Sequence, residues 1–178
     1  LAAAKVSSLS TKEIAEQLEI SFNLLTGGSR TALPRQQTIY ASINWSWDLL
    51  TEPEQMFMQQ LSVFSGGWTL EASESIVSGM FNGRSVFDLI TSLLDKNLLQ
   101  RTFDSSGATR FNMLVTIQEF ALDRLRSTGS ETETRNRHLA YFLDLAEEAD
   151  KEIHGENQVE WLNRMDDERD NFRTALNW

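Results

Sequence analysis

The sequence predicts a mostly α-helical protein that contains one small β-hairpin and ends in an α-helical hairpin. Three observations predict this fold class: recurring helix-start signals, apolar residues spaced three or four apart, and two short β-like runs that flank a polar turn. The chain has 178 residues, 40% hydrophobic residues, a net charge of −10 and no cysteine. These values fit a globular chain with an apolar core and exclude disulfides and thiolate chemistry.

Capping boxes mark the predicted helix starts. In this motif a Ser or Thr and an acidic residue three positions later satisfy each other's backbone N–H groups. The pairs are Ser10 with Glu13, Thr51 with Glu54, Ser85 with Asp88, Thr116 with Glu119, and Ser130 with Glu133. Each pair predicts a helix that starts there, and Pro53 fits the first turn of the second one.

Apolar residues at helical spacing follow these starts. They predict a broad apolar face over residues 86–94 and narrower stripes over 39–50 and 54–64. Beyond Gly129, residues 135–153 are predicted to form one long helix and residues 159–178 a second, separated by Gly155. Two antiparallel helices of this length resemble one unit of a helical repeat of the tetratricopeptide (TPR) type.

One segment has β character. Residues 97–103 and 109–115 flank a polar turn that contains Gly107, which predicts a β-hairpin. A helical cluster that ends in a hairpin and one more helix is typical of a winged-helix domain.

Gly66 and Gly67, in the stretch FSGGWTLEAS, raise the question of a phosphate site, because glycines before a helix can cradle phosphate. A phosphate-binding loop has the pattern GxxxxGK[ST], and no Lys follows Gly67. We interpret the pair as a turn in which Gly66 ends one helix in the left-handed conformation. Thr69 is then expected to cap the next helix, with Glu71 in its first turn.

The sequence contains no recognisable catalytic or metal-binding pattern. Its two histidines, His138 and His154, lie outside metal-ligand spacings and are expected at exposed or partly buried helix positions. The consecutive acids Asp166, Asp167 and Glu168 are expected to form a solvated, ion-paired surface. We therefore expect no enzymatic activity, and no metal or cofactor bound by these residues.

The predicted recognition helix of the winged-helix domain, residues 85–96, carries little positive charge. Arg84 and Lys96 flank it, whereas Asp88 and Asp95 lie within it. Binding to the DNA backbone depends on Lys and Arg that neutralise phosphates, so DNA binding is the less favoured interpretation. No apolar run approaches the length of a membrane span, and no membrane contact is expected.

Several stretches taken together resemble a known family. They are LAAAKVSSLS, RTALPRQQT, INWSWDLL, SVFSGGW, LLDKNLLQ, TIQEFALDRL and ERDNFRTALNW. They resemble the region behind the nucleotide-binding core of bacterial STAND ATPases, the NB-ARC-like group found in large LuxR-type and SARP-type transcriptional regulators. The resemblance covers nearly the whole chain.

The resemblance implies a cytoplasmic protein with three parts. Residues 1–33 would be the end of a helical domain that follows the ATPase core, 34–128 a winged-helix domain, and 129–178 the start of a TPR-like sensor array. In this family the winged helix is similar to a lid over bound ADP that ATP exchange moves. The Walker motifs are absent here, so ATP and ADP are implied only for a longer parent protein.

The resemblance also suggests contact residues. Related proteins carry a Met-His-Asp motif whose His contacts the nucleotide, and the matching positions here are Met113, Leu114 and Val115, which cannot replace that His. The candidate interdomain contacts, with the parent's own ATPase core as partner, are Pro34, Arg35, Trp45, Met113 and Leu114. The candidate protein-interaction face, with further repeats or a second copy as partner, is Phe142, Trp161 and Phe172.

We therefore predict a non-catalytic regulatory module that transmits a signal within a larger ATPase. Two alternatives remain open: a winged-helix DNA-binding domain, and a TPR-type protein-interaction adaptor.

Overall fold

The computed structural model describes residues 39–77, 81 and 83–178, and the chain divides into two compact units, Leu1–Leu50 and Thr51–Trp178. The predicted capping box at Ser10, Pro34 and Arg35 lie outside the described residues. In the first unit, helix α2 (Ile39–Asp48) agrees with the helix predicted there. Its Trp47 is buried, whereas Trp45 is 47% exposed.

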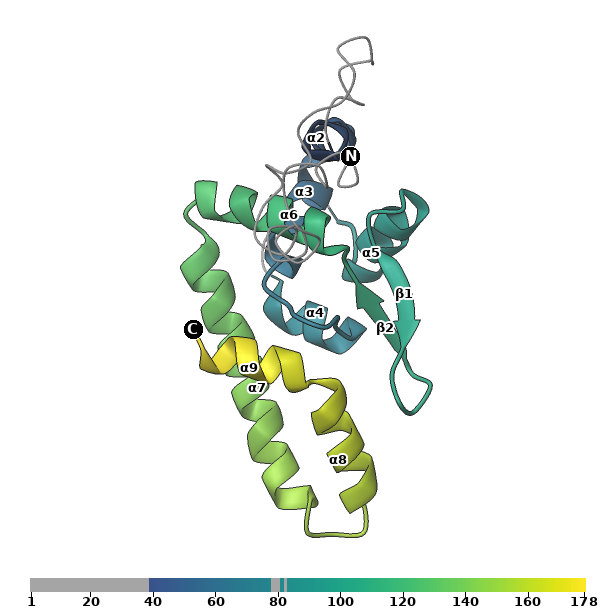
Figure 1. Ribbon diagram of the computed structural model, residues 1–178, viewed down its shortest axis with the longest axis vertical. Coiled ribbons are helices and arrows are strands. Elements are labelled where there is room, and N and C mark those ends of the chain that lie inside the picture. The colour runs from purple at the N-terminus through teal and green to yellow at the C-terminus, as the bar shows by residue number, and fades with distance from the viewer. Residues whose placement is uncertain (1–38, 78–80, 82) are drawn as a thin grey trace, which may run out of the picture. The chain divides into compact units, whose positions relative to one another are not determined.

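The second unit confirms the predicted fold class of a mostly helical protein with a small β-hairpin (Figure 1). Its elements in chain order are α3 (Glu52–Leu61), α4 (Leu70–Ile76), α5 (Val86–Asp95), β1 (Gln100–Phe103), β2 (Thr109–Asn112), α6 (Val115–Ser127), α7 (Glu131–Glu152), α8 (Gln158–Asp167) and α9 (Arg169–Leu176). Helices α7 and α8 lie side by side and form the predicted helical hairpin (Figure 1).

Local capping residues set three of the helix starts as predicted. The Thr51 N–H donates to Glu54 Oε2 at 2.8 Å before α3, and the Thr69 hydroxyl accepts from the Ala72 N–H at 3.1 Å before α4. At α5 the box is reciprocal, since the Ser85 hydroxyl and the Asp88 carboxylate each accept from the other's N–H. These bonds satisfy backbone donors that the first helical turn leaves unpaired.

Two other predicted starts differ. Helix α6 begins at Val115 with Leu114 as its N-cap, so Thr116 lies inside the first turn and makes no capping box. The chain passes into α6 almost directly from β2, and the Leu114 carbonyl already accepts from the Ile117 and Gln118 N–H groups at 2.9 Å. Ser130 does occupy the N-cap position of α7, but its side chain makes no capping bond.

The β-hairpin is shorter than its predicted strands. Strands β1 and β2 pair antiparallel from Gln100 opposite Asn112 to Phe103 opposite Thr109. Asn97 adopts a φ of 56°, and the Leu98 and Leu99 N–H groups bond back to the Leu93 carbonyl, so these residues finish α5 instead of starting a strand. We call β1, β2 and the turn Asp104–Ala108 the wing.

The sequence did not predict a third backbone segment on this sheet. Trp68 exchanges two backbone hydrogen bonds with Phe111 of β2, at 2.9 and 2.8 Å. The loop that precedes α4 is thereby fixed along the wing, and its Gly67 lies beside β2.

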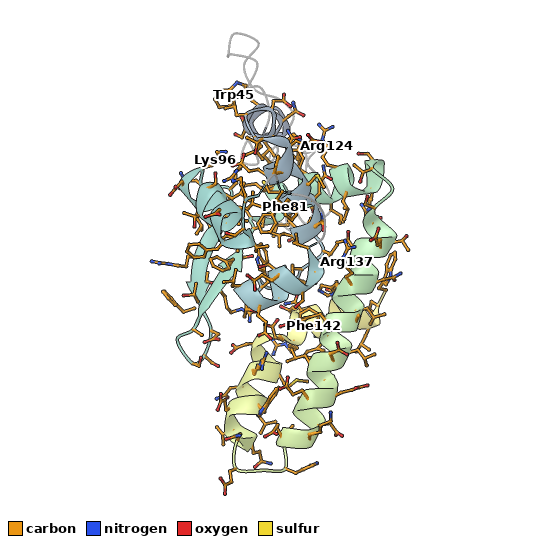
Figure 2. All side chains as sticks on the ribbon, turned by 180° about the vertical axis from the view of Figure 1, so that it is seen from behind. Trp45, Phe81, Lys96, Arg124, Arg137 and Phe142 are labelled. Carbon is orange, nitrogen blue, oxygen red and sulfur yellow. The ribbon has the colours of Figure 1, made fainter. Side chains whose placement is uncertain are left out.

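The core of the second unit extends from the winged-helix elements into the helical hairpin. Phe57, Leu61 and Leu93 are fully or almost fully buried, as the apolar stripes predict, and so is Phe120 of α6. An aromatic chain continues this core: Phe64 stacks on Trp68 and meets His138 on α7, and Phe142 meets both His138 and Phe172 of α9. Burial of these rings packs α7 and α9 directly against the winged-helix part (Figure 2).

His138 corrects the sequence analysis, because it is 2% exposed and not at a surface position. Burial lowers its pKa from 6.5 to about 4, the interaction with the Asn171 side chain opposes that shift, and the charge of Arg135 adds to it. The ring is therefore neutral at neutral pH and packs as an aromatic side chain. A buried position of this kind follows from the helices that cover it, which the local sequence does not specify.

Arg137 and Glu54 each make polar contacts that join helices. Arg137 on α7 donates to the Ile76 carbonyl at the end of α4 at 2.6 Å (Figure 2). Glu54 is 1% exposed, and its Oε1 accepts from Lys96 Nζ at 2.7 Å and from the Ser92 hydroxyl at 2.6 Å. Burial raises the pKa of Glu54, but the bonds from Lys96, Ser92 and Thr51 outweigh it and lower the pKa from 4.5 to about 2.

Replacing Glu54 with glutamine is expected to lower the free energy of unfolding by about 2 kcal/mol at neutral pH, and by progressively less in acid. A carboxylate with a lowered pKa in the folded state stabilises fully above about pH 4.5, and this stabilisation is lost as the pH falls toward 2. Urea denaturation of both proteins across this range measures the difference. Glu52→Gln on the exposed surface of the same helix is the control and changes stability by less than about 0.5 kcal/mol. A difference that stays constant with pH would contradict the prediction.

Candidate functional site

The wing is held against the helical hairpin by a buried polar cluster, which we call the wing clamp: Arg110, Glu168 and Asn171. Arg110 on β2 donates to both carboxylate oxygens of Glu168, and its Nη2 also donates to the Gly67 carbonyl at 3.2 Å. Asn171 Nδ2 donates to Glu168 Oε2 at 2.7 Å and to the Gly67 carbonyl at 2.8 Å. All three side chains are more than nine-tenths buried, so the clamp joins β2, the loop before α4 and the α8–α9 junction.

The wing clamp corrects two sequence predictions. Glu168 is not part of a solvated acidic surface, because it is 4% exposed and paired with Arg110. Residues 159–178 are not one helix, because α8 ends at Asp167 and Glu168 serves both as its C-cap and as the N-cap of α9. The break places the Glu168 carboxylate against β2 and leaves Asp166 exposed beside Arg169.

A second contact joins the tip of the wing to α8. Asp167 Oδ2 accepts from the Ser105 N–H at 3.2 Å and from the Ser105 hydroxyl at 2.6 Å. The turn itself is closed by Asp104, whose Oδ1 accepts from the Ser106 and Ala108 N–H groups at 2.9 and 2.8 Å. Neighbouring residues of the α8–α9 junction therefore bind two separate parts of the wing.

Gly66 and Gly67 form a turn and not a phosphate loop. Both have positive φ, 76° and 89°, which glycine adopts without strain. A Cβ at Gly67 would lie 2.7 Å from the Phe111 carbonyl oxygen, and one at Gly66 would lie 3.2 Å from Asp170 Cβ. Gly66 lies five positions after the last residue of α3, so it does not end that helix itself; the glycines instead let the loop approach both the wing and α9.

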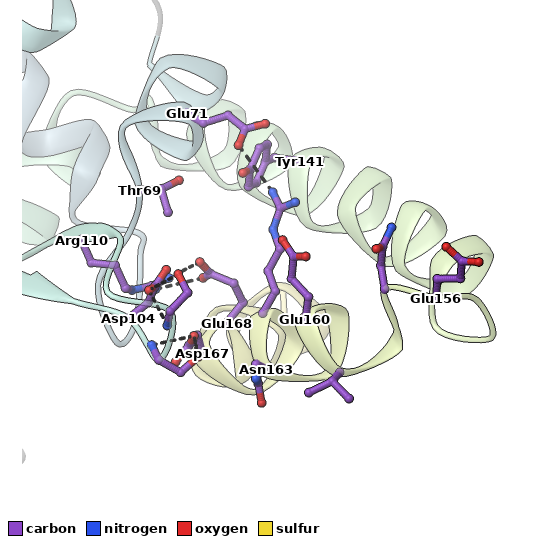
Figure 3. Close-up of a pocket in the computed structure, with 15 residues that line it drawn as sticks. Thr69, Glu71, Asp104, Arg110, Tyr141, Glu156, Glu160, Asn163, Asp167 and Glu168 are labelled. Carbon is purple, nitrogen blue, oxygen red and sulfur yellow. Dashed lines mark hydrogen bonds and ion pairs between the residues drawn. The ribbon is translucent and has the colours of Figure 1, made fainter.

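A polar cleft of about 620 Å³ opens beside the wing, between its turn, α4, α7 and α8 (Figure 3). Its charged lining residues are Glu71, Asp104, Arg110, Glu156, Glu160, Arg164, Asp167 and Glu168. Burial and the nearby Glu71 raise the pKa of Tyr141, whose ring lines the same cleft. Among the described residues, no group of three or more His, Asp and Glu side chains could hold a metal ion.

An apolar groove of about 450 Å³ lies on the helical hairpin. Its lining residues are Leu139, Phe142, Leu143, Ala146, Met165, Arg169, Phe172, Ala175 and Leu176. Leu143 is 55% and Leu176 83% exposed, which is unusual for leucines that share one groove.

The candidate contact residues proposed from the sequence do not gather in one site. Phe142 and Phe172 both line the apolar groove, with their rings 5.3 Å apart, although Phe142 is itself buried. Trp161 is not in the groove lining and lies under the Arg164 guanidinium group at 4.9 Å. Met113 is buried, whereas Leu114 is 47% exposed.

Sequence reasoning did not predict that Arg110 is a buried ion-pair partner, and it missed Asn171 as a site residue. Arg110 lies in a short strand that reads as solvent-exposed, so nothing local indicates a buried charge. Asn171 did carry a signal, because Asn is a poor residue for a helix interior unless its side chain has a partner.

Comparison with known proteins indicates a regulatory relationship. The chain is 40% identical over 178 residues to proteins of Mycobacterium tuberculosis and Mycobacterium bovis that are provisionally named HTH-type transcriptional regulators. The match covers 99% of this chain but 20% of those relatives, so the chain spans about a fifth of their length. Over 131 residues it is also 30% identical to two further proteins of these species whose names give no function; that match covers 72% of this chain and 33% of theirs. This similarity supports a relationship to transcriptional regulators.

Other comparisons add no assignment. No family model matches the chain, and no solved structure matches it. Within the part of the chain that the structure describes, none of the helices has the length and apolarity needed to cross a membrane.

The exposed leucines of the apolar groove are expected to cause concentration-dependent self-association. Burial of apolar surface favours association, and each leucine side chain contributes about 1.5–3 kcal/mol when fully buried. Sedimentation velocity at rising protein concentration measures it. The double variant Leu143→Ser/Leu176→Ser should remain monomeric, whereas Leu162→Ser, which removes an exposed leucine outside the groove lining, should associate like the wild type. A wild-type chain that stays strictly monomeric at high concentration would contradict this expectation.

Proposed function

We propose that the chain is a non-catalytic regulatory module of a larger transcriptional regulator and that it works through contacts within the polypeptide. The wing clamp is the observation that carries this proposal. Two groups of wing donors that could contact a nucleic acid, those of Ser105 and Arg110, are bonded to the α8–α9 junction instead, so the winged helix and the helical hairpin form one body. Such a body can pass a displacement of the helical hairpin to the winged helix without a separate hinge.

The resemblance to STAND ATPases suggests what the module contacts. In that proposal the winged helix is a lid on the nucleotide-binding core of a cytoplasmic parent protein, and ATP and ADP belong to that core. Leu114 and Val115 are 47% and 62% exposed at the start of α6 and offer an apolar contact for it. A nucleotide phosphate would need another partner, because neither side chain donates a hydrogen bond.

DNA binding by the winged helix is the second candidate, and the names of the relatives favour it. The charges around α5 oppose it. Asp88 and Asp95 are exposed, whereas Lys96 and Arg84, the two flanking cations, both bond to the buried Glu54, at 2.7 and 3.4 Å. The helix therefore presents little free positive charge to phosphates.

Titration with fluorescently labelled duplex DNA separates the two candidates. At about 50 mM salt the wild-type chain is expected to show no saturable binding, because the two cations that flank α5 are already bonded to Glu54. Binding that is tight at about 50 mM salt and falls steeply by about 200 mM would favour the DNA-binding candidate. Arg101→Gln on the exposed face of β1 is the matched variant, since it weakens binding only if the wing contacts the backbone.

The nucleotide part of the proposal has its own test. The reading frame upstream of the segment in a parent protein should encode GxxxxGK[ST] after a strand, and that protein should bind ATP. A parent without this motif would remove the nucleotide from the proposal but leave the regulatory module.

A further inference from the structure

We propose that Asp167 and Glu168, the acidic pair of the α8–α9 junction, hold the wing in an autoinhibited state by occupying the groups with which it would bind the phosphate backbone of duplex DNA. This inference goes beyond the proposed function, which concerns contacts within the polypeptide and does not require the wing to bind DNA.

The donors that the acidic pair occupies are of the kinds that bind phosphate. Arg110 presents both terminal nitrogens to the two oxygens of Glu168, the fork geometry that arginine also uses with phosphate. Ser105 presents a backbone N–H and a hydroxyl to one oxygen of Asp167, at 3.2 and 2.6 Å. Backbone N–H groups, hydroxyls and arginines account for much of the phosphate contact in protein–DNA complexes. The carboxylates of Asp167 and Glu168 thus accept the hydrogen bonds that we propose DNA phosphates would accept from the same donors.

The contact at the wing tip is exposed and can open without loss of the core. Ser105 and Ser106 are exposed and border the polar cleft, so the turn faces solvent on that side. The apolar residues that fix α7 and α9 to the winged helix, Phe64, Phe142 and Phe172, lie in the separate aromatic chain. Separation of the wing from α8 therefore breaks hydrogen bonds and ion pairs and leaves the aromatic chain in place.

Once released, the wing presents positive charge. Arg101 is exposed and lies over the Phe103 ring at 5.7 Å, and Arg110 would lose its carboxylate partner. Asp104 stays engaged by the amides of its own turn, including that of Ala108. The opened wing would then contact about two phosphates, which predicts a shallow salt slope of about −2.

Asp167→Asn tests the proposal, with Asp166→Asn as the matched control. Both variants remove one negative charge from α8, but Asp166 pairs with Arg169 and not with the wing. Hydrogen exchange of the Ser105 amide reports whether the wing tip opens, and anisotropy of a labelled duplex DNA at about 50 mM salt reports binding. We expect Asp167→Asn to speed exchange at Ser105 and to raise DNA affinity by about tenfold, and Asp166→Asn to change both less than about twofold.

A second substitution identifies the wing as the binding surface. Arg101→Gln in the Asp167→Asn background should abolish the gain in DNA affinity, and thermal melting confirms that each variant is folded. Three results would overturn the proposal: faster exchange at Ser105 with no gain in DNA affinity, an equal gain from Asp166→Asn, or unchanged exchange in Asp167→Asn. The proposed function survives each of them, because it does not require that the wing bind DNA.

Discussion

Replacing Glu168 with alanine is expected to lower the free energy of unfolding by about 3–5 kcal/mol. The substitution leaves the Arg110 guanidinium group in a site where its side chain is 7% exposed, without its charge partner. Desolvation of an unpaired charge costs more than the pair itself contributes, so the loss exceeds that of a surface ion pair. Denaturant unfolding of the whole chain measures it.

The control and the compensating variant distinguish this cause from a general loss of packing. Asp166→Ala removes an exposed partner of Arg169 and should cost less than about 1 kcal/mol. The double variant Arg110→Leu/Glu168→Leu removes both charges and should recover most of the loss, because apolar residues can replace a buried ion pair at little cost. If the double variant is less stable than Glu168→Ala, the unpaired charge is not the cause.

Replacing Gly67 with alanine is expected to cost about 2–4 kcal/mol, from a left-handed backbone and a steric clash together. The new Cβ would lie 2.7 Å from the Phe111 carbonyl oxygen, which accepts the Trp68 N–H at 2.9 Å. The loop would have to move away from β2, and the Gly67 carbonyl would lose its bonds from Arg110 and Asn171.

Gly107→Ala is the matched control for backbone strain. Gly107 has a φ of 86°, close to that of Gly67, but nothing lies within 4 Å of its added Cβ. It should cost only about 1–2 kcal/mol, which is the strain of the left-handed conformation. If both variants lose the same free energy of unfolding, the close approach of Gly67 to β2 does not contribute to the destabilisation.

Local sequence determined the elements whose causes are themselves local. Thr51, Thr69 and Ser85 start helices because each side chain lies within one turn of the backbone groups that it binds. The hairpin forms because the turn at Asp104 closes through its own side chain. The apolar spacing of α5 buries Leu89, Ile90 and Leu93, as the periodicity predicts.

The candidate site was predictable only in part. The sequence indicated an apolar face on the helical hairpin, and Phe142 and Phe172 do line a groove there. It also indicated that α5 is poor in cations, but it gave no sign that Lys96 and Arg84 are already bonded to Glu54. Spacing along a helix reveals which face is apolar. The partner of a charged side chain, in contrast, lies on a segment that is distant in sequence and is brought close only by folding.

The sequence by itself determined where α3, α4 and α5 start, where the hairpin turns and which faces are apolar, because these features depend on residues within a few positions of one another. Only the tertiary structure decided that Glu168 breaks a predicted helix, that His138 is buried, and that Arg110 belongs to a wing clamp. Arg110 and Glu168 are 58 positions apart. Whether a charged side chain is solvated or buried depends on the residues that the fold places beside it, and the local sequence does not specify those residues.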